Sequence, residues 1–542
     1  MEDNFLKKIE HTLVAIFLIL GLIAIVTVVI LICTSNNQDK NITGMTETKG
    51  EETTYDWEAG LSDSTIWMPD ELGLYEQMPA LSVEDRDEKK VTLNQFQNNP
   101  TVITFFASWC GDCKEQMPKM QEYIEKSKKY GDITFIMIDK TDGEKETKES
   151  GETYFESLGL DADLYFDTGL STYNEFGMHN VPSTIFIDSM GKIAAICPKQ
   201  ITDSDVFEAY LERACKGTNF ATQQFICNNL LDDEGGVHSE YQKDAGQTYQ
   251  SDVLSESEGL LLQYAVSTEN RELYQKVYSY IENHFNSKGL FPWKVSKSEK
   301  TQVNALIDDL RIYNAIEGAK QKWNTKDSLL SVYCDNLLKY GTDNGQFVDY
   351  YDPKTKTYAN RFTLCYADFL TMDKLAKEDE LFKGPCDKAK DIVLNGQISD
   401  TFPMFYSYYD YEKKKYDTCD LNMAEAMITL LHLSESHLLP DASLEWIEKE
   451  ISEGGVKARY TVKGDVVNGY EYESTAVYAT IAMIALEEKD EMLFRQAVNK
   501  MEKMRINDKS LEYNGAFGLT DGTGITSFDQ LMPLTTYAKV YY

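Results

Sequence analysis

The sequence predicts a multidomain protein in which an N-terminal transmembrane helix is followed by an α/β domain and then by an all-α domain. Three observations support this prediction: an apolar stretch near the N-terminus, strand-like runs with a cysteine pair over residues 67–216, and helical periodicity over residues 217–542. At 542 residues the chain exceeds what one hydrophobic core usually holds, so two or more folded domains are expected.

The segment 12–33 is predicted to be a transmembrane anchor. Residues 13–32 are apolar apart from Thr27, which matches the roughly 20 residues that a helix needs to cross a bilayer. A secretory signal has a shorter apolar stretch of about 7–15 residues and a small-residue cleavage site, and no such site follows here. Cys33 leaves lipidation as an alternative, although Ile32 before it fits a lipoprotein signal poorly. We therefore favour an uncleaved anchor.

The charges around this segment predict its orientation. Lys7 and Lys8 precede the apolar stretch, whereas the sequence after it begins with the polar, uncharged residues Thr-Ser-Asn-Asn-Gln. By the positive-inside rule, residues 1–11 form a cytoplasmic tail and everything after residue 33 is extracytoplasmic. Residues 34–66 are rich in Thr, Glu, Asn and Gly, which is typical of a linker. The expected location is the plasma membrane, crossed once.

The composition limits the classes of partner. The formal net charge of −36 argues against nucleic acid, because no basic surface is available to neutralise phosphates. It also disfavours peripheral binding to anionic lipid, so that neutral or cationic partners such as polysaccharides remain. Only six histidines occur, with no His-Glu-x-x-His motif and no second Cys-x-x-Cys pair. Neither a metal nor another cofactor is therefore expected.

Cys110 and Cys113 are predicted to form a redox pair. Residues 101–106 are apolar, β-branched and aromatic, as in a buried strand, and helix-forming residues follow the cysteines. At such a strand-to-helix junction Cys110 lies at a helix N-terminus, where free N–H groups and the helix dipole stabilise a thiolate. Cys113, one turn on, can then resolve a mixed disulfide. Half a zinc site, an inert disulfide and a core pair are the competing explanations.

Trp109 before the pair and Pro118 after it distinguish this segment from a structural disulfide. The segment resembles the membrane-anchored thioredoxin-like reductases of the TlpA and ResA type, and the resemblance extends over about residues 68–216 of the predicted domain 67–216. It implies that Pro182 is cis and packs beside the cysteines, and that the backbone of Val181 pairs with the substrate. We expect Trp109 and Val181 to contact the substrate. The implied partners are thiol or disulfide client proteins and an electron-donor protein.

Two positions depart from the thioredoxin pattern. Thioredoxin has a buried Asp six residues before its first active-site cysteine, and Thr104 occupies that position here. Proton transfer to Cys113 must then use water or another group. Asp112, between the cysteines, should oppose a thiolate and favour the disulfide. This predicts a potential nearer thioredoxin's roughly −270 mV than the roughly −120 mV of DsbA.

The sequence does not determine which of the remaining cysteines form disulfides with one another. Nine lie outside the anchor, an odd number, so at least one is unpaired or bonded to another molecule. The candidates beyond the redox pair are Cys197, Cys215, Cys227, Cys334, Cys365, Cys386 and Cys419.

Residues 217–542 show helical periodicity with carboxylates set among aromatic residues. Leu330, Tyr333, Cys334 and Leu337 recur at i, i+3, i+4 and i+7, as on the buried face of a helix. Glycosidases use two carboxylates around the scissile bond and aromatic faces against which sugars stack. Acidic residues at helix starts are, however, also simple caps, and tyrosines at helical spacing are usually core. Composition alone therefore does not predict a glycosidase.

The order of short segments adds a resemblance to the family-8 glycoside hydrolases and their six-hairpin relatives, which form an (α/α)6 barrel. In that family a Ser-Glu-Gly segment carries the general acid, and Ser255-Glu256 matches it. A Trp in a Gly-Leu-x-x-Trp segment contacts sugar, and Trp293 matches it. The resemblance thus implies that Glu256 protonates the leaving group and that Trp293 binds substrate.

Two more segments match in part. Asp309 matches the second acid of an Asp-Ala-Asp segment that binds the central sugar, although Ile307 replaces the first acid. Tyr416-Asp417 matches a Tyr-Asp-Ala-Cys-Arg segment that supplies the general base, although Asp420 replaces the Arg. The resemblance implies an inverting mechanism with Asp417 as the base and Asp309 and Tyr416 as substrate contacts. The competitors for these roles are Glu258, Asp308, Asp368 and Asp420.

Three hypotheses follow for the whole chain. In the first, an anchored thiol–disulfide reductase is joined to an endo-acting glycosidase that acts on a cell-surface or extracellular polysaccharide. In the second, the redox enzyme carries a barrel that only binds glycan. In the third, the barrel is a protein-interaction module that presents redox clients.

Overall fold

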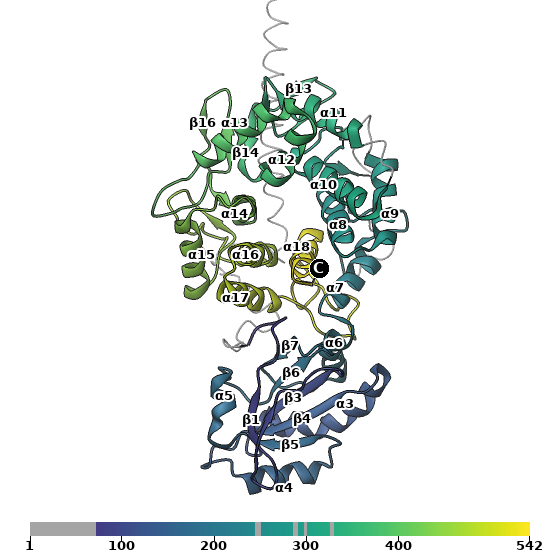
Figure 1. Cartoon of the computed structure of the whole chain (residues 1–542), viewed down its shortest axis with the longest axis vertical. Helices are drawn as coiled ribbons and strands as arrows, with labels where there is room; N and C mark the ends of the chain where they lie inside the picture. The colour runs from purple at the N-terminus through teal and green to yellow at the C-terminus, as the bar shows by residue number, and fades with distance from the viewer. Residues whose placement is uncertain (1–71, 244–250, 286–290, 297–300, 326–329, 542) are drawn as a thin grey trace, which may run out of the picture. The chain divides into compact units, whose positions relative to one another are not determined.

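The computed structural model describes residues 72–243, 251–285, 291–296, 301–325 and 330–541 (Figure 1). The predicted anchor, residues 12–33, and the predicted linker, residues 34–66, lie outside these described residues. Within the described ranges, no helix combines the length and the apolar character needed to span a membrane. The prediction of an anchor is therefore not addressed by the fold.

The N-terminal domain is built on a seven-stranded sheet in the order β2-β1-β5-β4-β3-β6-β7. Its strands are β1 (Leu81–Glu84), β2 (Lys90–Leu93), β3 (Thr101–Phe106), β4 (Thr134–Asp139), β5 (Asp163–Phe166), β6 (Ser183–Ile187) and β7 (Ile193–Cys197). Strands β3, β4 and β5 are parallel, and β6 and β7 continue the sheet antiparallel. Every residue of β3, β6 and β7 is buried, which explains their continuous apolar runs.

Helices cover this sheet and place the cysteine pair at its edge. They are α2 (Gly111–Gln116), α3 (Met120–Ser127), α4 (Lys148–Leu158), α5 (Ser171–Glu175) and α6 (Ser204–Lys216). β3 ends at Phe106, and β6, which is antiparallel to it, begins at Ser183 opposite Phe105. The turn after β3 and the residues before β6 therefore meet at one edge of the sheet. The α/β thioredoxin-like domain predicted for residues 67–216 is confirmed.

The C-terminal domain is a closed ring of inner helices. These are α8 (Ser255–Ser267), α10 (Leu306–Trp323), α12 (Phe369–Glu378), α14 (Met423–Glu435), α16 (Thr475–Glu488) and α18 (Ser527–Tyr541). Each inner helix contacts the next along the chain, and α18 returns to contact α8. The ring can be followed from teal α8 to yellow α18 in Figure 1. The predicted barrel of helical hairpins is confirmed at this level.

Outer helices pack around the ring. They are α7 (Phe220–Phe225), α9 (Arg271–Tyr280), α11 (Leu330–Tyr340), α13 (Lys383–Leu394), α15 (Asp441–Glu453) and α17 (Glu491–Glu502). α9, α11, α13 and α17 contact α8, α10, α12 and α16, respectively. The predicted apolar face of α11 is buried at all four of its positions. Residues 475–485 of α16 are buried on every side, as its continuous apolar sequence predicts.

Because inner and outer helices alternate along the chain, all the inner helices run in the same direction. Their first turns therefore lie at the same end of the ring, together with the short strands that precede them, such as β8 (Val253–Leu254) before α8 and β17 (Leu421–Asn422) before α14. Several first turns carry acidic residues: Glu256 in α8, Asp308 in α10 and Glu425 in α14. Their carboxylates gain from the positive ends of the helix dipoles.

Candidate functional site

The turn before α2 brings four predicted redox residues together. Cys110 is the extended N-cap residue of α2, and Cys113 lies in its first turn. The thiol of Cys110 donates to the backbone oxygen of Val181 at 3.2 Å, and the Val181–Pro182 bond is cis. Cys110 is 8% exposed and Cys113 is fully buried. Only Cys110 is thus reached from solvent, as a nucleophile must be.

The two thiols differ electrostatically. Burial is the main reason that the pKa of Cys113 is raised well above its usual value, and the charges of Cys110 and Asp112 raise it further. The backbone N–H of Ala107 opposes this shift. Cys113 therefore remains a thiol at neutral pH, where it can give its proton to a departing sulfur. Trp109, the predicted client contact, is 43% exposed beside the pair.

Around Thr104, where thioredoxin has a buried Asp, uncharged side chains form a hydrogen-bond network. Thr104 Oγ1 and Thr184 Oγ1 are 3.2 Å apart, and Gln116 Nε2 donates to Thr184 Oγ1 at 3.3 Å. Gln116 Oε1 in turn accepts from the backbone N–H of Ile201 at 2.7 Å. Thr104, Thr184 and Gln116 are fully buried. Sequence reasoning missed Gln116, whose signal was its position one helical turn after Cys113.

A second candidate site lies at the helix N-termini of the ring. Arg311 Nη1 is 3.5 Å from Glu256 Oε2 and 3.2 Å from Asp308 Oδ1. The hydroxyl of Ser255 donates to the other oxygen of Asp308 at 2.7 Å. The Glu256 side chain is 33% exposed, whereas those of Arg311 and Asp308 are nearly buried. Glu256 is therefore the member of this group that a substrate can reach.

The surroundings of Glu256 favour its protonated form. Its pKa is raised to about 7, mainly by burial; the charge of Arg311 lowers it, and the charges of Asp308 and Glu425 raise it. A carboxyl group with a pKa near the working pH is suited to general acid catalysis. Glu256 can thus both hold and release a proton near neutrality.

Glu425 is a further carboxyl group at this end of the ring. Its side chain is exposed, and the protein around it raises its pKa by desolvation. Arg459 and Arg361 oppose that shift. Arg361 Nε also donates to the buried Asp349 at 2.7 Å. Sequence reasoning did not select Glu425, because nothing in its helix marks it apart from an ordinary first-turn acid.

The structure places the backbone of Trp293 against Ser255, the residue before Glu256. The backbone N–H and the hydroxyl of Ser255 both donate to the Trp293 carbonyl, at 3.0 and 3.1 Å. Trp293 is 40% exposed, and Lys294 Nζ lies 4.9 Å from its ring centre. Trp293 thus presents an exposed aromatic ring of the kind on which sugars stack.

Asp309 is not part of the hydrogen-bonded group formed by Glu256, Asp308 and Arg311. It is buried, and one of its oxygens accepts from Asn304 Nδ2 at 2.6 Å. Burial raises its pKa well above the usual value. Its neighbour Asp308 is the residue that contacts Arg311 beside Glu256. Along this helix the structure thus places Asp308, rather than Asp309, next to the candidate acid.

Asp417 follows β16 (Lys415–Tyr416) and is half-buried. One of its oxygens accepts from the backbone N–H of Cys419 at 3.0 Å, and its side chain is hydrogen-bonded to Tyr408. Within the described part of the chain, no hydrogen bond or ion pair joins Asp417 to Glu256. Tyr416 donates to the Ile392 carbonyl at 2.6 Å and stacks on Tyr406.

Two of the competing carboxyl groups, Glu258 and Asp368, have structural partners. Glu258 is buried and accepts from the backbone N–H of Val237 at 2.6 Å. Asp368 caps α12 by accepting from the backbone N–H of Thr371. Asp420 is exposed. Among the acids selected from the sequence, Glu256 is the one that combines partial exposure with a raised pKa.

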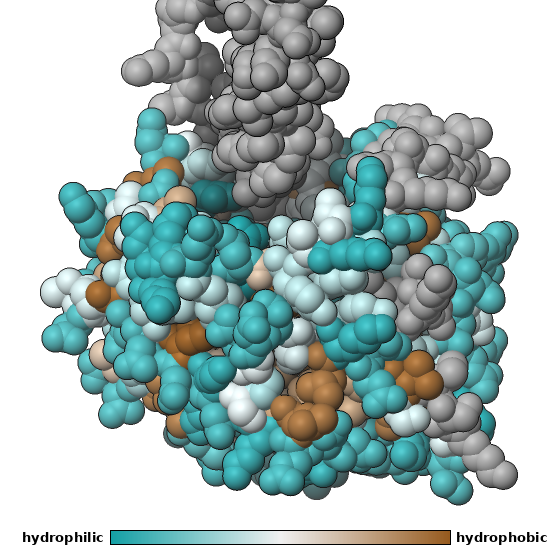
Figure 2. Space-filling view, turned by 90° about the horizontal axis from the view of Figure 1, so that it is seen from above, coloured by the Kyte–Doolittle hydropathy of each residue, from teal (hydrophilic) through white to brown (hydrophobic). Residues whose placement is uncertain are grey.

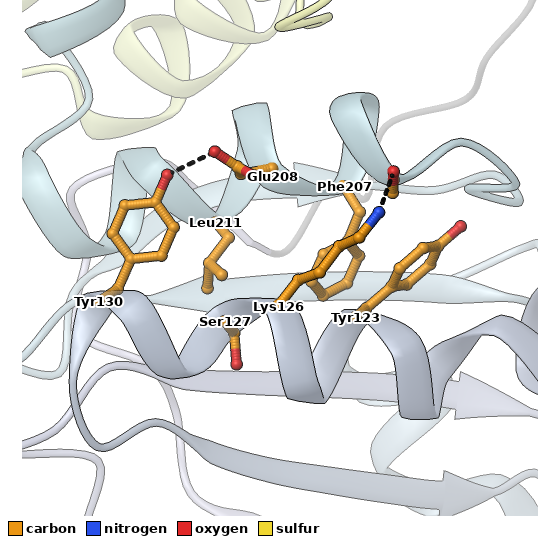
Figure 3. Close-up of a pocket in the computed structure, with 8 residues that line it drawn as sticks. Tyr123, Lys126, Ser127, Tyr130, Phe207, Glu208 and Leu211 are labelled. Carbon is orange, nitrogen blue, oxygen red and sulfur yellow. Dashed lines mark hydrogen bonds between the residues drawn. The ribbon is translucent and has the colours of Figure 1, made fainter.

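A small pocket between α3 and α6 contains none of the predicted site residues (Figure 3). Tyr130 donates to Glu208 at 2.8 Å, and Lys126 donates to the hydroxyl of Ser204 at 2.9 Å. Its volume of about 10 Å³ is about the room of one water molecule. The polar groups that line it are paired, so it offers no site for a substrate.

Residues 74–196 match the AhpC/TSA family. The chain is also 26% identical over 137 residues to the thiol-disulfide oxidoreductase ResA of Bacillus thuringiensis (strain Al Hakam), which covers 25% of this chain and 76% of ResA. These similarities agree with the thioredoxin-like sheet and its Cys-x-x-Cys turn. The resemblance stated for the N-terminal domain is confirmed.

Two similarities extend over a larger part of the chain. It is 26% identical over 327 residues to YdaJ of Bacillus subtilis (strain 168), a protein named as a lipoprotein, covering 59% of this chain and 86% of YdaJ. The structure of an α-amylase from Clostridium perfringens superposes with a TM-score of 0.55 and 29% identity, covering 60% of this chain and 98% of the amylase. The all-α domain thus has the fold of a known glycosidase.

Proposed function

We propose that the protein is a membrane-anchored, extracytoplasmic thiol–disulfide oxidoreductase of the reductase type whose barrel hydrolyses a cell-surface or extracellular polysaccharide. For the redox activity, the observation that carries the proposal is the group formed by Cys110, Cys113, Val181 and the cis Pro182. For the hydrolase, it is the partly exposed Glu256 with its raised pKa beside Arg311 and Asp308.

The redox step transfers two electrons to a client disulfide. The Cys110 thiolate attacks one client sulfur, which forms a mixed disulfide and releases the other client sulfur as a thiol with a proton. Cys113 then attacks Cys110, so that the client leaves fully reduced and a Cys110–Cys113 bond forms. An electron-donor protein restores the dithiol. Reduction of insulin disulfides by the wild-type chain, and its loss in Cys110→Ser, tests this step.

In the barrel, Glu256 protonates the leaving oxygen of a glycosidic bond, and Asp417 activates the attacking water. This inverting scheme requires roughly 6.5–9.5 Å between the two carboxyl groups. Trp293, Asp309 and Tyr416 are the proposed substrate contacts. Glu425 is the rival for the role of base, because its charge reaches Glu256. Activity of Glu425→Gln with none in Asp417→Asn supports the assignment, and the reverse result moves the base to Glu425.

The linkage that is cleaved is open to direct test. The amylase similarity favours an α-glucan, whereas the family-8 resemblance favours a β-linked polymer. Release of reducing ends from both kinds of polymer distinguishes them. If no polymer is cut but Trp293→Ala weakens glycan binding, the barrel is a glycan-binding module. If glycan binding is absent as well, a client-binding role for the barrel takes its place.

The proposed anchor is the segment 12–33, with the N-terminus in the cytoplasm. The similarity to a protein named as a lipoprotein keeps a lipid at Cys33 as the alternative attachment. Intact cells treated with a membrane-impermeant thiol reagent should be labelled at Cys419, which is exposed. Mass spectrometry of the N-terminal peptide then separates an intact anchor from a cleaved, lipidated Cys33.

A further inference from the structure

Two buried carboxyl groups lie directly behind the turn that carries Cys110. Asp139 ends β4 and Glu146 precedes α4, and both are fully buried. β3 and β4 are parallel neighbours, with Phe106 opposite Asp139. The turn after β3 and the loop after β4 therefore leave the sheet side by side.

Glu146 holds the turn through Ser108, two residues before Cys110. The backbone N–H and the hydroxyl of Ser108 both donate to Glu146 Oε2, at 2.9 and 3.0 Å. The hydroxyl of Ser150 in α4 donates to Glu146 Oε1 at 3.3 Å. Hydrogen bonds to an ionised carboxylate are about twice as strong as neutral ones. The position of the turn thus depends on the charge of Glu146.

The loop that carries Glu146 is itself ordered. Asp142 Oδ1 accepts the backbone N–H groups of residues 144, 145 and 146 at 2.8–2.9 Å. Lys145 Nζ lies 5.5 Å from the ring centre of Trp109, the residue next to Cys110. Ser108 and Trp109 of the turn are thus contacted by Glu146 and Lys145 of this loop, respectively.

Asp139 lacks a partner for one of its oxygens unless it carries a proton. Its Oδ2 accepts from the hydroxyl of Thr141 at 2.5 Å, whereas Oδ1 is buried with no donor among the described residues. Its side chain is hydrogen-bonded to the carboxyl group of Glu146, which requires a proton between them. A Cβ at Gly151 of α4 would lie 2.4 Å from Asp139 Cγ, so α4 packs directly on this acid.

The neighbouring charges support one proton for the pair. The pKa of Asp139 is raised to about 8, mainly by burial and also by the charges of Glu146 and Asp142, against the opposing effect of the Thr141 hydrogen bond. From α4, Gly151 and Ser150 face the pair, whereas Lys148 is directed to the Phe166 ring. From the redox turn, Ser108 contacts Glu146. Among the described residues, neither Asp139 nor Glu146 forms an ion pair with a Lys or Arg side chain that would offset a second negative charge there.

We propose that Asp139 and Glu146 share one proton and act as positioning residues for Cys110, holding the turn 107–110 in place through Ser108. This rests on the proposed oxidoreductase activity. When the shared proton is lost at alkaline pH, the two buried charges repel each other and the hold on Ser108 weakens. The reactivity of each Cys110 thiolate then falls, although more thiolate is present.

The test is the alkylation rate of Cys110 in the reduced, full-length protein from pH about 6 to about 10, measured by peptide mass spectrometry. Asp139→Asn keeps a donor toward Glu146 but cannot ionise. Glu146→Gln removes the charge that Ser108 contacts. Glu144→Gln is the matched control, because Glu144 is an exposed carboxylate of the same loop.

In the wild type, the rate per thiolate should fall above pH about 8, and in Asp139→Asn this fall should be absent. Glu146→Gln should react about tenfold more slowly at neutral pH, since charge-assisted hydrogen bonds are lost, whereas Glu144→Gln should match the wild type. A fall above pH 8 that persists in Asp139→Asn overturns the proposal, even if Glu146→Gln fails to fold. Inactivity of the wild type toward insulin would instead refute the oxidoreductase activity itself.

Discussion

The charges around Glu256 predict opposite changes from two substitutions. Asp308→Asn removes a negative charge and should lower the pKa of Glu256, whereas Arg311→Met removes a positive charge and should raise it. A general acid must be protonated, so activity is lost as pH rises through its pKa. The alkaline limb of kcat/KM, near pH 7 in the wild type, should move down in Asp308→Asn and up in Arg311→Met.

The distances set the size of these changes. At 3.5 Å, with an effective dielectric constant of about 20, the Arg311–Glu256 interaction is about 5 kcal/mol. One oxygen of each carboxylate contacts the same Arg311 nitrogen, so these two oxygens are at most about 7 Å apart and repel by at least about 2.4 kcal/mol before solvent screening. One third of the Glu256 side chain is exposed, and solvent screens both interactions. We therefore expect shifts of about one pH unit each.

The assay is the pH profile of reducing-end release on whichever glucan the wild type cleaves. Arg311→Lys is the control, because it keeps the charge and should shift the limb less than Arg311→Met. Shifts of the same sign in Asp308→Asn and Arg311→Met, or no shift in either, would refute Glu256 as the titrating acid.

Three further predictions concern single acids. Asp139 keeps a proton in the folded state up to pH about 8, while the unfolded chain loses it near pH 4. The free energy of unfolding should therefore fall as pH rises through that window, which hydrogen exchange of the β4 amides can measure. In Asp139→Asn this dependence of stability on pH should be weaker. Asp417→Asn should reduce glycan hydrolysis at least about 100-fold, and Glu425→Gln should reduce it much less. Single-turnover assays measure both rates, and a larger loss in Glu425→Gln than in Asp417→Asn would contradict the prediction. Asp112→Asn should make the redox potential less negative by on the order of 10–30 mV, because Asp112 disfavours a thiolate; an unchanged glutathione equilibrium would contradict this.

The redox site could be predicted from the sequence because its signals are local. Cys110 and Cys113 lie within one helical turn of a strand end, and Val-Pro precedes a second strand, so short motifs specify the contacts that the structure shows. The neutral network around Gln116 could not be predicted, since it joins residues that only strand pairing brings together.

The barrel site was less predictable for two physical reasons. Its closure depends on the contact of α8 with α18, which are more than 250 residues apart in sequence. The phase of a helix also decides which of two adjacent acids faces a site, because each residue turns by about 100°. The sequence could not distinguish Asp308 from Asp309, and the structure places Asp308 beside Arg311.

The surface of the ring is mostly hydrophilic on the face seen in Figure 2, with scattered apolar residues. Exposed apolar side chains of this kind are common on soluble domains and do not identify a docking surface. Specific partners are therefore better sought at the two sites than across this face.

The central claim, that one chain joins a thiol–disulfide oxidoreductase to a glycosidase, is tested most directly at Glu256. The measurement is reducing-end release by the full-length protein on α- and β-linked glucans, with Glu256→Gln and the control Glu269→Gln, whose carboxylate lies beyond the other end of α8 and is 70% exposed. We predict release by the wild type and Glu269→Gln, and a loss of at least about 100-fold in Glu256→Gln. Equal release by all three proteins, or release by none, would contradict the account.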